Sequence, residues 1–515
     1  MISMADMIEH LGTRHHDSQK PALVTGTDVL TYAQVRDRMW QCAHVLDANG
    51  IGAGSRVAAL MNNRPEYSIL FAALSALNAS ITPINVRFVA SEVAAAVEYM
   101  RPAVFVVDRD FEALAREAMS AVDPGLRPEL LVLAGEAMSP GEDLAAQLDA
   151  APSTPMEVVA DPDACAYLAL TGGTTGARKA AIIPAGNFYT TAMRLALHLY
   201  VRKSDVTMTC GSFSHTMPFY YAAMQLYCGG TVVILPKFSG AAAIEAVSEH
   251  KVTWFAAVPT MYSDIMDAAA KSPGCDLSSV ERYASSGAPM LTVTKDRLMG
   301  ILGSEFYEYY GATEVGWATT LEPRDQLRKT RCVGQPMPGT EVKIVGVDKQ
   351  LCPPGEVGVI FMRGDVIMTG YFERPDDTVQ VFDGGWATVG DMGYLDEEGY
   401  LFLVDRQKDM IVSGGINVYP VEIEEVLMQL PGSVEIAVIG IPDARWGESV
   451  LAVCVVDGDY TAWEAAAKKS VTEHLSSYKR PKAYSFVDTL PRSHAGKILK
   501  RVIREPYWKT EERDI

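Results

Sequence analysis

Short runs of β-branched and other apolar residues alternate with longer alanine-rich segments over about the first 320 residues. The runs predict strands at residues 55–60, 103–108, 130–135, 231–236 and 252–258. The clearest predicted helices lie at residues 30–50 and 91–100. Strands that alternate with helices form largely parallel sheets with helices between the strands. This pattern restricts the first part of the chain to an α/β architecture.

The pattern changes after about residue 320, where short strands alternate with glycine turns in a β-rich subdomain. A smaller α+β unit follows, with a predicted helix at 421–430 and predicted strands at 434–442 and 451–458. We expect a large N-terminal domain of mixed sheets packed with helices over residues 1–405, which includes the β-rich subdomain. A small C-terminal domain is expected over residues 406–515.

The composition excludes several classes of protein. A chain of 515 residues with 48% hydrophobic residues can build at least two domains. It has no uninterrupted apolar run of about 18 residues, and its first 20 residues do not have the pattern of a signal peptide. A net charge of −19 argues against a nucleic-acid surface, and the eight scattered cysteines are typical of reduced thiols. We expect a cytoplasmic protein without a membrane span; its oligomeric state, a homodimer included, is left open.

A loop rich in glycine and threonine, TGGTTGARK at residues 171–179, directly follows a predicted strand at 166–170. Such a loop is either a flexible turn or a phosphate cradle, in which backbone N–H groups, hydroxyls and a lysine surround an anion. A P-loop needs Ser or Thr after its lysine to bind magnesium, and here Ala180 follows Lys179. The glycine spacing of a dinucleotide-binding motif is also missing. We therefore favour a phosphate cradle whose metal ligand comes from elsewhere in the chain.

Further blocks follow the loop in a fixed order. They are SSGAP at 285–289, YYGATE at 309–314, VGDMG at 389–393, DRQKDMIVSGGINVYP at 405–420 and HAGK at 494–497. Together with the loop, these blocks resemble the adenylate-forming superfamily of acyl-CoA synthetases, luciferases and peptide-synthetase adenylation domains. The resemblance covers nearly the whole chain and is closest to acyl- or aryl-CoA ligases. It implies that the protein binds ATP, Mg²⁺ and coenzyme A and that its small C-terminal domain is mobile.

The resemblance also implies roles for single residues of the N-terminal domain. The loop residues that would hold the ATP phosphates are Thr171, Gly173, Thr174, Thr175, Gly176 and Lys179. The adenine wall would consist of Ser286, Gly287, Ala288 and Pro289. The YYGATE block would place Tyr310 and Gly311 near the adenine, Thr313 beside a phosphate and Glu314 on the metal. A carboxylate is a suitable ligand for a hard, oxygen-seeking cation.

In the C-terminal part, the resemblance implies that Asp391 binds the ribose and that Arg406 contacts the ribose or a phosphate. Lys408 falls on the hinge position of the family. The remaining positions are Gly414 and Gly415 beside the thin substrate arm, Trp446 and Lys479 on the face for coenzyme A, and Lys497 as the catalytic lysine. With Lys497, the resemblance assigns catalytic positions to Thr174, His215 and Glu314. A lysine ammonium suits the neutralisation of charge that develops between a carboxylate and the α-phosphate.

The segment SFSHTMPFYYAAM at 212–224 resembles the family segment that lines the acid pocket, with His215 as a gate or pocket wall. Amino-acid-activating relatives carry an aspartate near the position of Thr216. Without that aspartate, a substrate ammonium would be buried unpaired, which costs several kcal/mol. The apolar side chains of the segment suit either a pocket lining or plain core packing: Met217, Phe219, Tyr220 and Met224.

The sequence therefore predicts an ATP-dependent acid:CoA ligase for a hydrophobic acid, aromatic or medium- to long-chain aliphatic. The acid would be activated as acyl-AMP and transferred to coenzyme A, with release of AMP and pyrophosphate. Coenzyme A is the expected acceptor because no carrier-protein segment follows the C-terminal unit. The nearest alternative is a stand-alone acyl- or aryl-adenylating enzyme that loads a carrier protein. A luciferase-type oxygenase and a non-catalytic nucleotide-binding protein are further alternatives.

Overall fold

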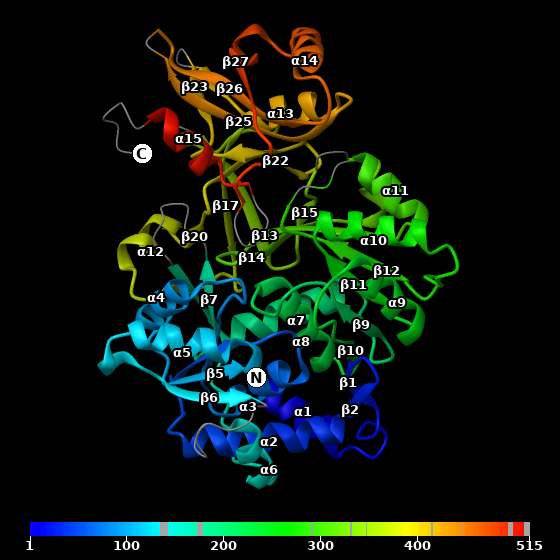
Figure 1. The fold of residues 1–515 in the computed structure, drawn as a ribbon, viewed down its shortest axis with the longest axis vertical. Coiled ribbons are helices and arrows are strands. Elements are labelled where there is room, and N and C mark those ends of the chain that lie inside the picture. Colours follow the sequence, from blue (N-terminus) through cyan, green and yellow to red (C-terminus); the bar gives the residue numbers. More distant parts are fainter. Residues whose placement is uncertain are drawn as a thin grey trace. The chain divides into compact units, whose positions relative to one another are not determined.

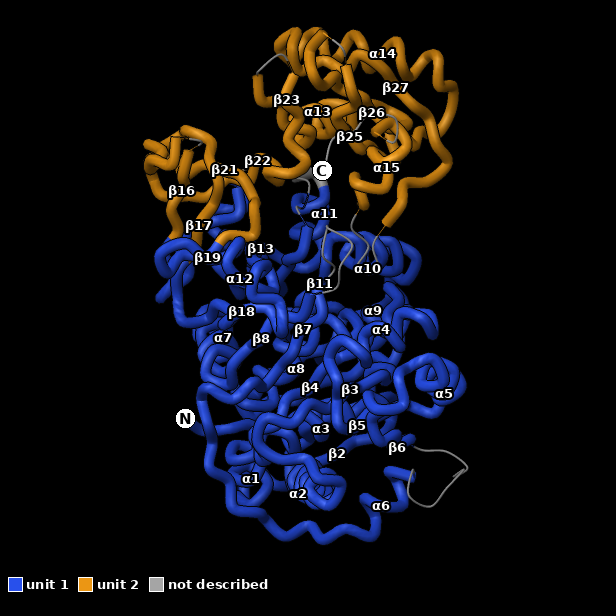
Figure 2. Tube along the Cα trace, turned by 90° about the vertical axis from the view of Figure 1, so that its left-hand side faces the viewer, with its two compact units in different colours: residues 1–341, 363–387 blue, residues 342–362, 388–515 orange. Residues whose placement is uncertain are grey.

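The computed structural model describes the whole chain except residues 134–142, 172–178, 289, 291, 330–331, 347, 414–415, 444, 493–497 and 509–515. It contains two compact units (Figure 2). The first consists of residues 1–341 and 363–387, and the second of residues 342–362 and 388–515. Each unit is defined by the contacts within it. The predicted division between residues 405 and 406 instead marks a hinge between domains. That division stays a prediction.

A seven-stranded sheet in the first unit contains the two strands that flank the predicted phosphate loop (Figure 1). Its central strands are parallel, and β5 has the sequence VFVVD with every residue buried. Buried runs of this kind need helices on both faces of the sheet. From edge to edge the sheet consists of β18 (Gly370–Tyr371), β8 (Lys179–Pro184), β7 (Cys165–Thr171), β4 (Ser80–Pro83), β3 (Arg56–Leu60), β5 (Val104–Asp108) and β6 (Glu129–Leu133).

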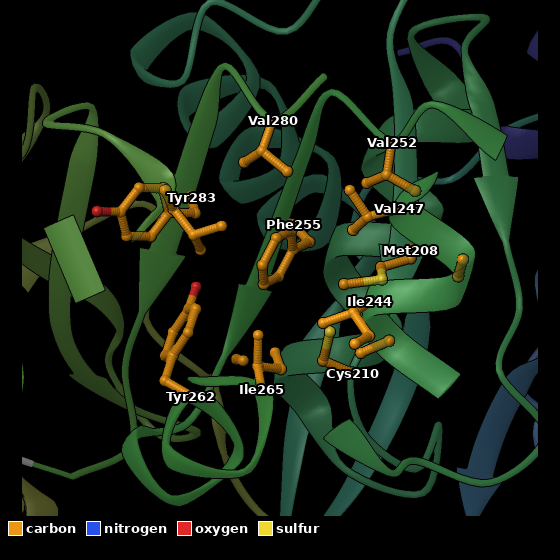
Figure 3. Close-up of a cluster of buried hydrophobic side chains, with 14 of the residues drawn as sticks. Met208, Cys210, Ile244, Val247, Val252, Phe255, Tyr262, Ile265, Val280 and Tyr283 are labelled. Atoms are coloured by element: carbon orange, nitrogen blue, oxygen red, sulfur yellow. The ribbon is translucent and has the colours of Figure 1, made fainter. Parts of the chain in front are cut away.

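A nine-stranded sheet forms the other half of the first unit. Figure 3 shows part of the core on one of its faces, where Phe255 of β11 packs beside Tyr262 and Tyr283. The hydroxyl of Tyr262 donates to the carbonyl of Ala284 at 2.7 Å, so this buried polar group is satisfied. The strand order is β15 (Gln335–Pro336), β14 (Gly316–Leu321), β13 (Phe306–Ala312), β12 (Arg282–Ser285), β11 (Trp254–Ala257), β9 (Val206–Thr209), β10 (Thr231–Val233), β1 (Pro21–Thr25) and β2 (Asp28–Thr31).

Helices connect most of these strands, as the alternation in the sequence predicts. A short hairpin of β19 (Phe382–Asp383) and β20 (Trp386–Ala387) follows the last helix of the first unit. The helices of this unit are α1 (Met4–Thr13), α2 (Tyr32–Ala48), α3 (Pro65–Ala76), α4 (Ala90–Met100), α5 (Glu112–Ala121), α6 (Leu144–Ala150), α7 (Ala185–His198), α8 (Thr216–Tyr227), α9 (Gly240–His250), α10 (Pro259–Lys271), α11 (Thr292–Leu302) and α12 (Pro375–Val381).

An aromatic cluster fixes α8, the helix of the predicted acid pocket. The ring of Tyr220 on α8 lies 4.0 Å from Phe188 of α7, between centroids, and Phe219 lies 4.9 Å from Phe71 of α3. Both α3 and α8 bury residues on all their faces, as expected for helices that are apolar all round. The cluster therefore holds the N-terminus of α8, where His215 is the N-cap residue.

The second unit contains a five-stranded sheet and three helices within the described residues. The sheet runs through β24 (Ile416–Val418), β23 (Ile411–Ser413), β26 (Gly447–Val456) and β25 (Ser433–Asp443), and β27 (Ala483–Phe486) pairs with β26. The helices are α13 (Pro420–Met428), α14 (Tyr460–His474) and α15 (Lys500–Trp508). Before this sheet, β17 (Gly358–Gly364), β21 (Asp391–Leu395) and β22 (Leu401–Arg406) are antiparallel, and β16 (Thr340–Val345) pairs with β17.

The fold class expected from the sequence is confirmed: mixed sheets with helices in a large N-terminal part, and a small α+β C-terminal part. All eight cysteines are free thiols, as expected. Of the helices in the described part of the chain, none combines the length and the apolar character needed to cross a membrane. The cytoplasmic location stays a prediction.

Candidate active site

Lys179 is the first residue of β8 and lies at the end of the predicted phosphate loop. Its Nζ is 2.5 Å from Oδ1 of Asp377 on α12 and 5.3 Å from the centroid of the Tyr371 ring on β18. Across the ladder between β7 and β8, Lys179 pairs with Thr171, so the two ends of the loop are neighbours. The ammonium group therefore has an anion and an aromatic face beside it.

Tyr371 also contacts Glu314, the predicted metal ligand. Its hydroxyl donates to Oε1 of Glu314 at 2.8 Å. Burial raises the pKa of Tyr371 above its usual value, and the charge of Glu314 acts in the same direction, so the hydroxyl stays a donor. One tyrosine thus contacts both the predicted phosphate-binding lysine and the predicted metal ligand.

The backbone explains why Tyr371 reaches Lys179. In the antiparallel pair of β8 and β18, Tyr371 lies opposite Ala181, which makes Lys179 a diagonal neighbour on the same face of the sheet. Gly370 has a φ of +152°, and a Cβ atom there would lie 2.9 Å from Cγ2 of Thr378. A glycine is therefore needed where β18 passes close to α12.

The YYGATE block forms the end of β13 and the turn before β14. Tyr310 is buried in β13, and Gly311 lies so close to the next strand that a Cβ atom would be 1.9 Å from the carbonyl oxygen of Gly316. Thr313 and Glu314 lie in the turn and are partly exposed. The carbonyl of Glu314 accepts the N–H of Met368 at 3.0 Å, which holds the turn next to the segment before β18.

The predicted adenine wall and acid segment meet in the structure. The hydroxyl of Ser286 donates to Sδ of Met217 on α8 at 3.0 Å. Gly287 has a φ of +87°, which favours glycine, and Ala288 beside it is exposed. Of the four side chains of the acid segment that were candidates for the lining, Met217 is partly exposed, and the other three belong to the core: Phe219, Tyr220 and Met224.

In the second unit, the structure pairs the two residues with predicted ribose contacts. Asp391 begins β21 and lies opposite Arg406 at the end of β22. Nε of Arg406 is 3.2 Å from Oδ1 of Asp391. This ion pair orients a carboxylate, which can accept hydrogen bonds from the two hydroxyls of a ribose.

Next to this pair lies a buried charge cluster of Asp405, Glu424 and Lys500. Asp405 accepts the N–H groups of Arg406 at 2.7 Å and Val421 at 3.2 Å, and Nζ of Lys500 is 2.8 Å from Oε1 of Glu424. Burial raises the pKa of Asp405 from 3.8 to about 6, although Lys500 and the two N–H donors act in the opposite direction. Burial opposes the charge of Lys500, but the two carboxylates raise its pKa above the usual value.

The predicted hinge and the predicted face for coenzyme A also lie in the second unit. The carbonyl of Lys408 accepts a hydrogen bond from Nη1 of Arg504 on α15 at 3.1 Å. Trp446 is 44% exposed between β25 and β26, with the guanidinium of Arg445 4.8 Å from its ring centroid. Lys479 forms an ion pair with Glu422, so its charge is partly compensated within the chain.

Several predicted site residues lie outside the described residues. They are Gly173, Thr174, Thr175, Gly176, Pro289, Gly414, Gly415 and Lys497. The roles assigned to these residues, and to the site residues that the structure describes, stay predictions.

Residues 12–372 match the family described as AMP-binding enzyme, and residues 422–497 match the AMP-binding enzyme C-terminal domain. The chain belongs to the AMP-binding enzyme family.

Relatives with curated names are similar over nearly their whole length. The long-chain-fatty-acid–CoA ligase FadD13 of Mycobacterium tuberculosis is 33% identical over 94% of each chain. The feruloyl-CoA synthase of Amycolatopsis sp is 33% identical over 94% of this chain and 95% of its own. The fatty acid–[acyl-carrier-protein] ligase ScoC of Streptomyces coeruleorubidus is 29% identical over 97% and 96%. The ATP-bound structure of MatB from Rhodopseudomonas palustris superposes with a TM-score of 0.88 at 28% identity, over 98% and 99% of the chains.

The described residues of this AMP-binding enzyme fit a magnesium site that is completed by a nucleotide. Among them, no cluster of three or more His, Cys, Asp or Glu side chains could hold a metal. Glu314 offers a partly exposed carboxylate. Protein sites for Mg²⁺ commonly use one or two carboxylates together with substrate phosphates and water, so a single carboxylate near the predicted phosphate-binding lysine is sufficient.

Sequence reasoning missed Tyr371 and Asp377. They belong to the segment TGYFERPDDT at 369–378, in which a Gly-Tyr pair precedes a proline and two acids. The Gly-Tyr pair marks a close backbone approach beside an aromatic side chain, and Pro375 marks a helix start. Neither signal identifies Lys179 as the residue that Tyr371 and Asp377 contact.

The raised pKa of Asp405 predicts a pH dependence of stability. The folded protein holds this proton more tightly than the unfolded chain, so the contribution of Asp405 to stability falls as the pH rises from about 4 to about 6. A pKa of about 6 against 3.8 corresponds to about 3 kcal/mol. Asp405→Asn lacks this loss, so urea unfolding should show the variant gaining up to about 3 kcal/mol on wild type between these pH values.

The exposed Asp488 provides the control, because Asp488→Asn should leave the pH dependence of wild type unchanged. A stability difference between Asp405→Asn and wild type that is constant across this pH range would contradict the raised pKa.

Proposed function

We propose that this AMP-binding enzyme is an ATP-dependent acid:CoA ligase for a hydrophobic carboxylic acid, aromatic or medium- to long-chain aliphatic. It forms acyl-AMP and pyrophosphate, then transfers the acyl group to coenzyme A and releases AMP. The observation that carries the proposal is the near full-length similarity to named CoA ligases for both kinds of acid. The charged residues that the chemistry requires are present in this chain, which speaks against a non-catalytic nucleotide-binding protein: Lys179, Glu314, Asp391, Arg406 and Lys497.

In the first step, an oxygen of the acid attacks the α-phosphate of ATP and pyrophosphate leaves. Lys179 binds the outer phosphates, and Asp391 accepts the ribose hydroxyls. Lys497 stabilises the negative charge that develops between the carboxylate and the α-phosphate. In the second step, the thiol of coenzyme A attacks the acyl carbonyl and AMP leaves. Activation as an adenylate divides one difficult condensation into two easier displacements.

Glu314 would hold Mg²⁺, and Tyr371 supports the proposal by fixing one oxygen of that carboxylate at 2.8 Å. When bound, the ion supplies neutralisation of phosphate charge. Thr313 lies on the same turn as Glu314, and in this proposal its hydroxyl contacts a phosphate.

A hydrophobic acid is favoured by the residues at the start of α8. Thr216 offers no charge to an amino-acid substrate, and Met217 presents a partly exposed apolar side chain beside Ser286. Since Phe219, Tyr220 and Met224 are core residues, the lining at α8 would come mainly from Met217 and His215. The cytoplasmic location and the lack of nucleic-acid binding are parts of the proposal that rest on the sequence alone.

A carrier protein is the second candidate acceptor. The similarity to ScoC, a named acyl-carrier-protein ligase, favours this alternative. In this proposal, the exposed Trp446 and the compensated Lys479 would contact either acceptor.

The acid class and the acceptor can be tested together. The hydrophobic acids octanoate, decanoate, benzoate and cinnamate are compared with alanine and malonate as substrates. For each acid, AMP release is measured with coenzyme A, with a phosphopantetheinylated carrier protein and without an acceptor. Hydrophobic monocarboxylates should give at least about tenfold higher kcat/KM, because an unpaired buried charge costs more than about 1.4 kcal/mol. AMP release that needs the carrier protein would select the alternative, and ADP as product would contradict the mechanism.

The two steps require different groups at one acyl centre, so Lys408 is proposed as the hinge between two arrangements of the C-terminal domain. Lys408→Pro fixes φ near −65° and restricts Gln407 before it. We expect acyl-AMP formation at a nearly normal rate and thioester formation at least about a hundredfold slower. Single-turnover measurements of each step provide the test.

The control Lys408→Ala keeps the backbone free and should be much milder in the second step. Full thioester synthesis by the proline variant would show that Lys408 is not the hinge.

A further inference from the structure

Lys179, which binds phosphate in the proposed function, already forms an ion pair with a carboxylate of its own chain. Its Nζ lies 2.5 Å from Oδ1 of Asp377, and the two side chains are only 14% and 25% exposed. The Tyr371 ring lies on another side of the ammonium, 5.3 Å away. The positive charge is therefore compensated by the protein before any nucleotide arrives.

The start of α12 holds Asp377 in place. Pro375 occupies the first turn of the helix, where its ring is favourable. The hydroxyl of Thr378 accepts the N–H of Tyr371 at 2.9 Å and donates to the carbonyl of Arg374 at 2.8 Å, which ties the helix to β18. The preceding Asp376 is exposed to solvent. Of these two adjacent carboxylates, α12 thus brings Asp377 to the lysine.

A phosphate group that reaches Lys179 would stand beside the carboxylate of Asp377. Two anions at one ammonium repel each other, and a partly buried site screens this repulsion less than bulk water does. The carboxylate and the phosphate therefore compete for the same cation. Asp377 lowers the affinity for any ligand that places a phosphate there.

We infer that Asp377 is an internal competitor of the nucleotide phosphates for Lys179 and thereby sets the affinity of the protein for ATP. In the nucleotide-free protein it holds Lys179 against Tyr371, and nucleotide binding displaces it from the lysine. The inference rests on the proposed function, in which Lys179 binds the outer phosphates of ATP. AMP lacks those phosphates, so Asp377 should leave the affinity for AMP nearly unchanged.

Isothermal titration calorimetry on the full-length protein, with MgCl₂ and without acid or coenzyme A, measures the Kd of ATP and of AMP. We expect Asp377→Asn to lower the Kd of ATP about fivefold and to change the Kd of AMP by less than about twofold. Asp377→Ala should act in the same direction, since the effect comes from the lost charge. The matched control Asp376→Asn should change neither value, and Lys179→Ala should raise the Kd of ATP.

An unchanged or higher Kd for ATP in both Asp377 variants would overturn the inference, and so would an equal decrease for AMP, which would indicate a general change of the site. If wild type binds ATP and Lys179→Ala weakens that binding, either result leaves the proposed function intact. If wild type binds neither nucleotide, the proposed function fails and the inference fails with it.

Discussion

The antiparallel pairing of β18 with β8 is the constraint on which the candidate site of the first unit depends. It joins residues almost two hundred positions apart, and the carbonyl of Ala180 accepts the N–H of Phe372 at 2.8 Å. The pair sets the register that puts Tyr371 diagonally across from Lys179. From this register follow the cation–π contact, the ion pair with Asp377 and the hydrogen bond to Glu314. A slip by one residue would turn Tyr371 to the other face of the sheet.

In the second unit, the backbone around the proposed hinge depends in a similar way on a few side-chain contacts. Asp405 precedes Arg406 and lies three residues before Lys408, and its buried carboxylate binds two backbone N–H groups near Lys500 and Glu424. Arg504, from the same helix as Lys500, binds the carbonyl of Lys408. The backbone around the proposed hinge is therefore held by side chains of α15, which begins three residues after Lys497.

The sequence predicted the fold well where one local pattern decided the structure. The run VFVVD is apolar and β-branched throughout, and it became a fully buried strand. The blocks at 285–289 and 309–314 were expected to share one site, and they begin near the ends of two paired strands, β12 and β13. The roles of their residues stay predictions.

Prediction failed where a side chain's partner depends on a distant strand. Asp377 looks like an ordinary acid at a helix start, and only the pairing of β18 with β8 places it on Lys179. The apolar pattern of 212–224 could not separate lining from core, because Phe219 and Tyr220 are buried by aromatic rings of α3 and α7.

The most direct test of the central claim follows one oxygen atom. If the carboxylate attacks the α-phosphate and the thiol later attacks the carbonyl, the bridging oxygen stays with AMP. A hydrophobic acid labelled with ¹⁸O in both carboxylate oxygens, incubated with the protein, ATP, Mg²⁺ and coenzyme A, should yield AMP with one ¹⁸O atom by mass spectrometry. Unlabelled AMP, or label in pyrophosphate or orthophosphate, would contradict activation of the acid through acyl-AMP.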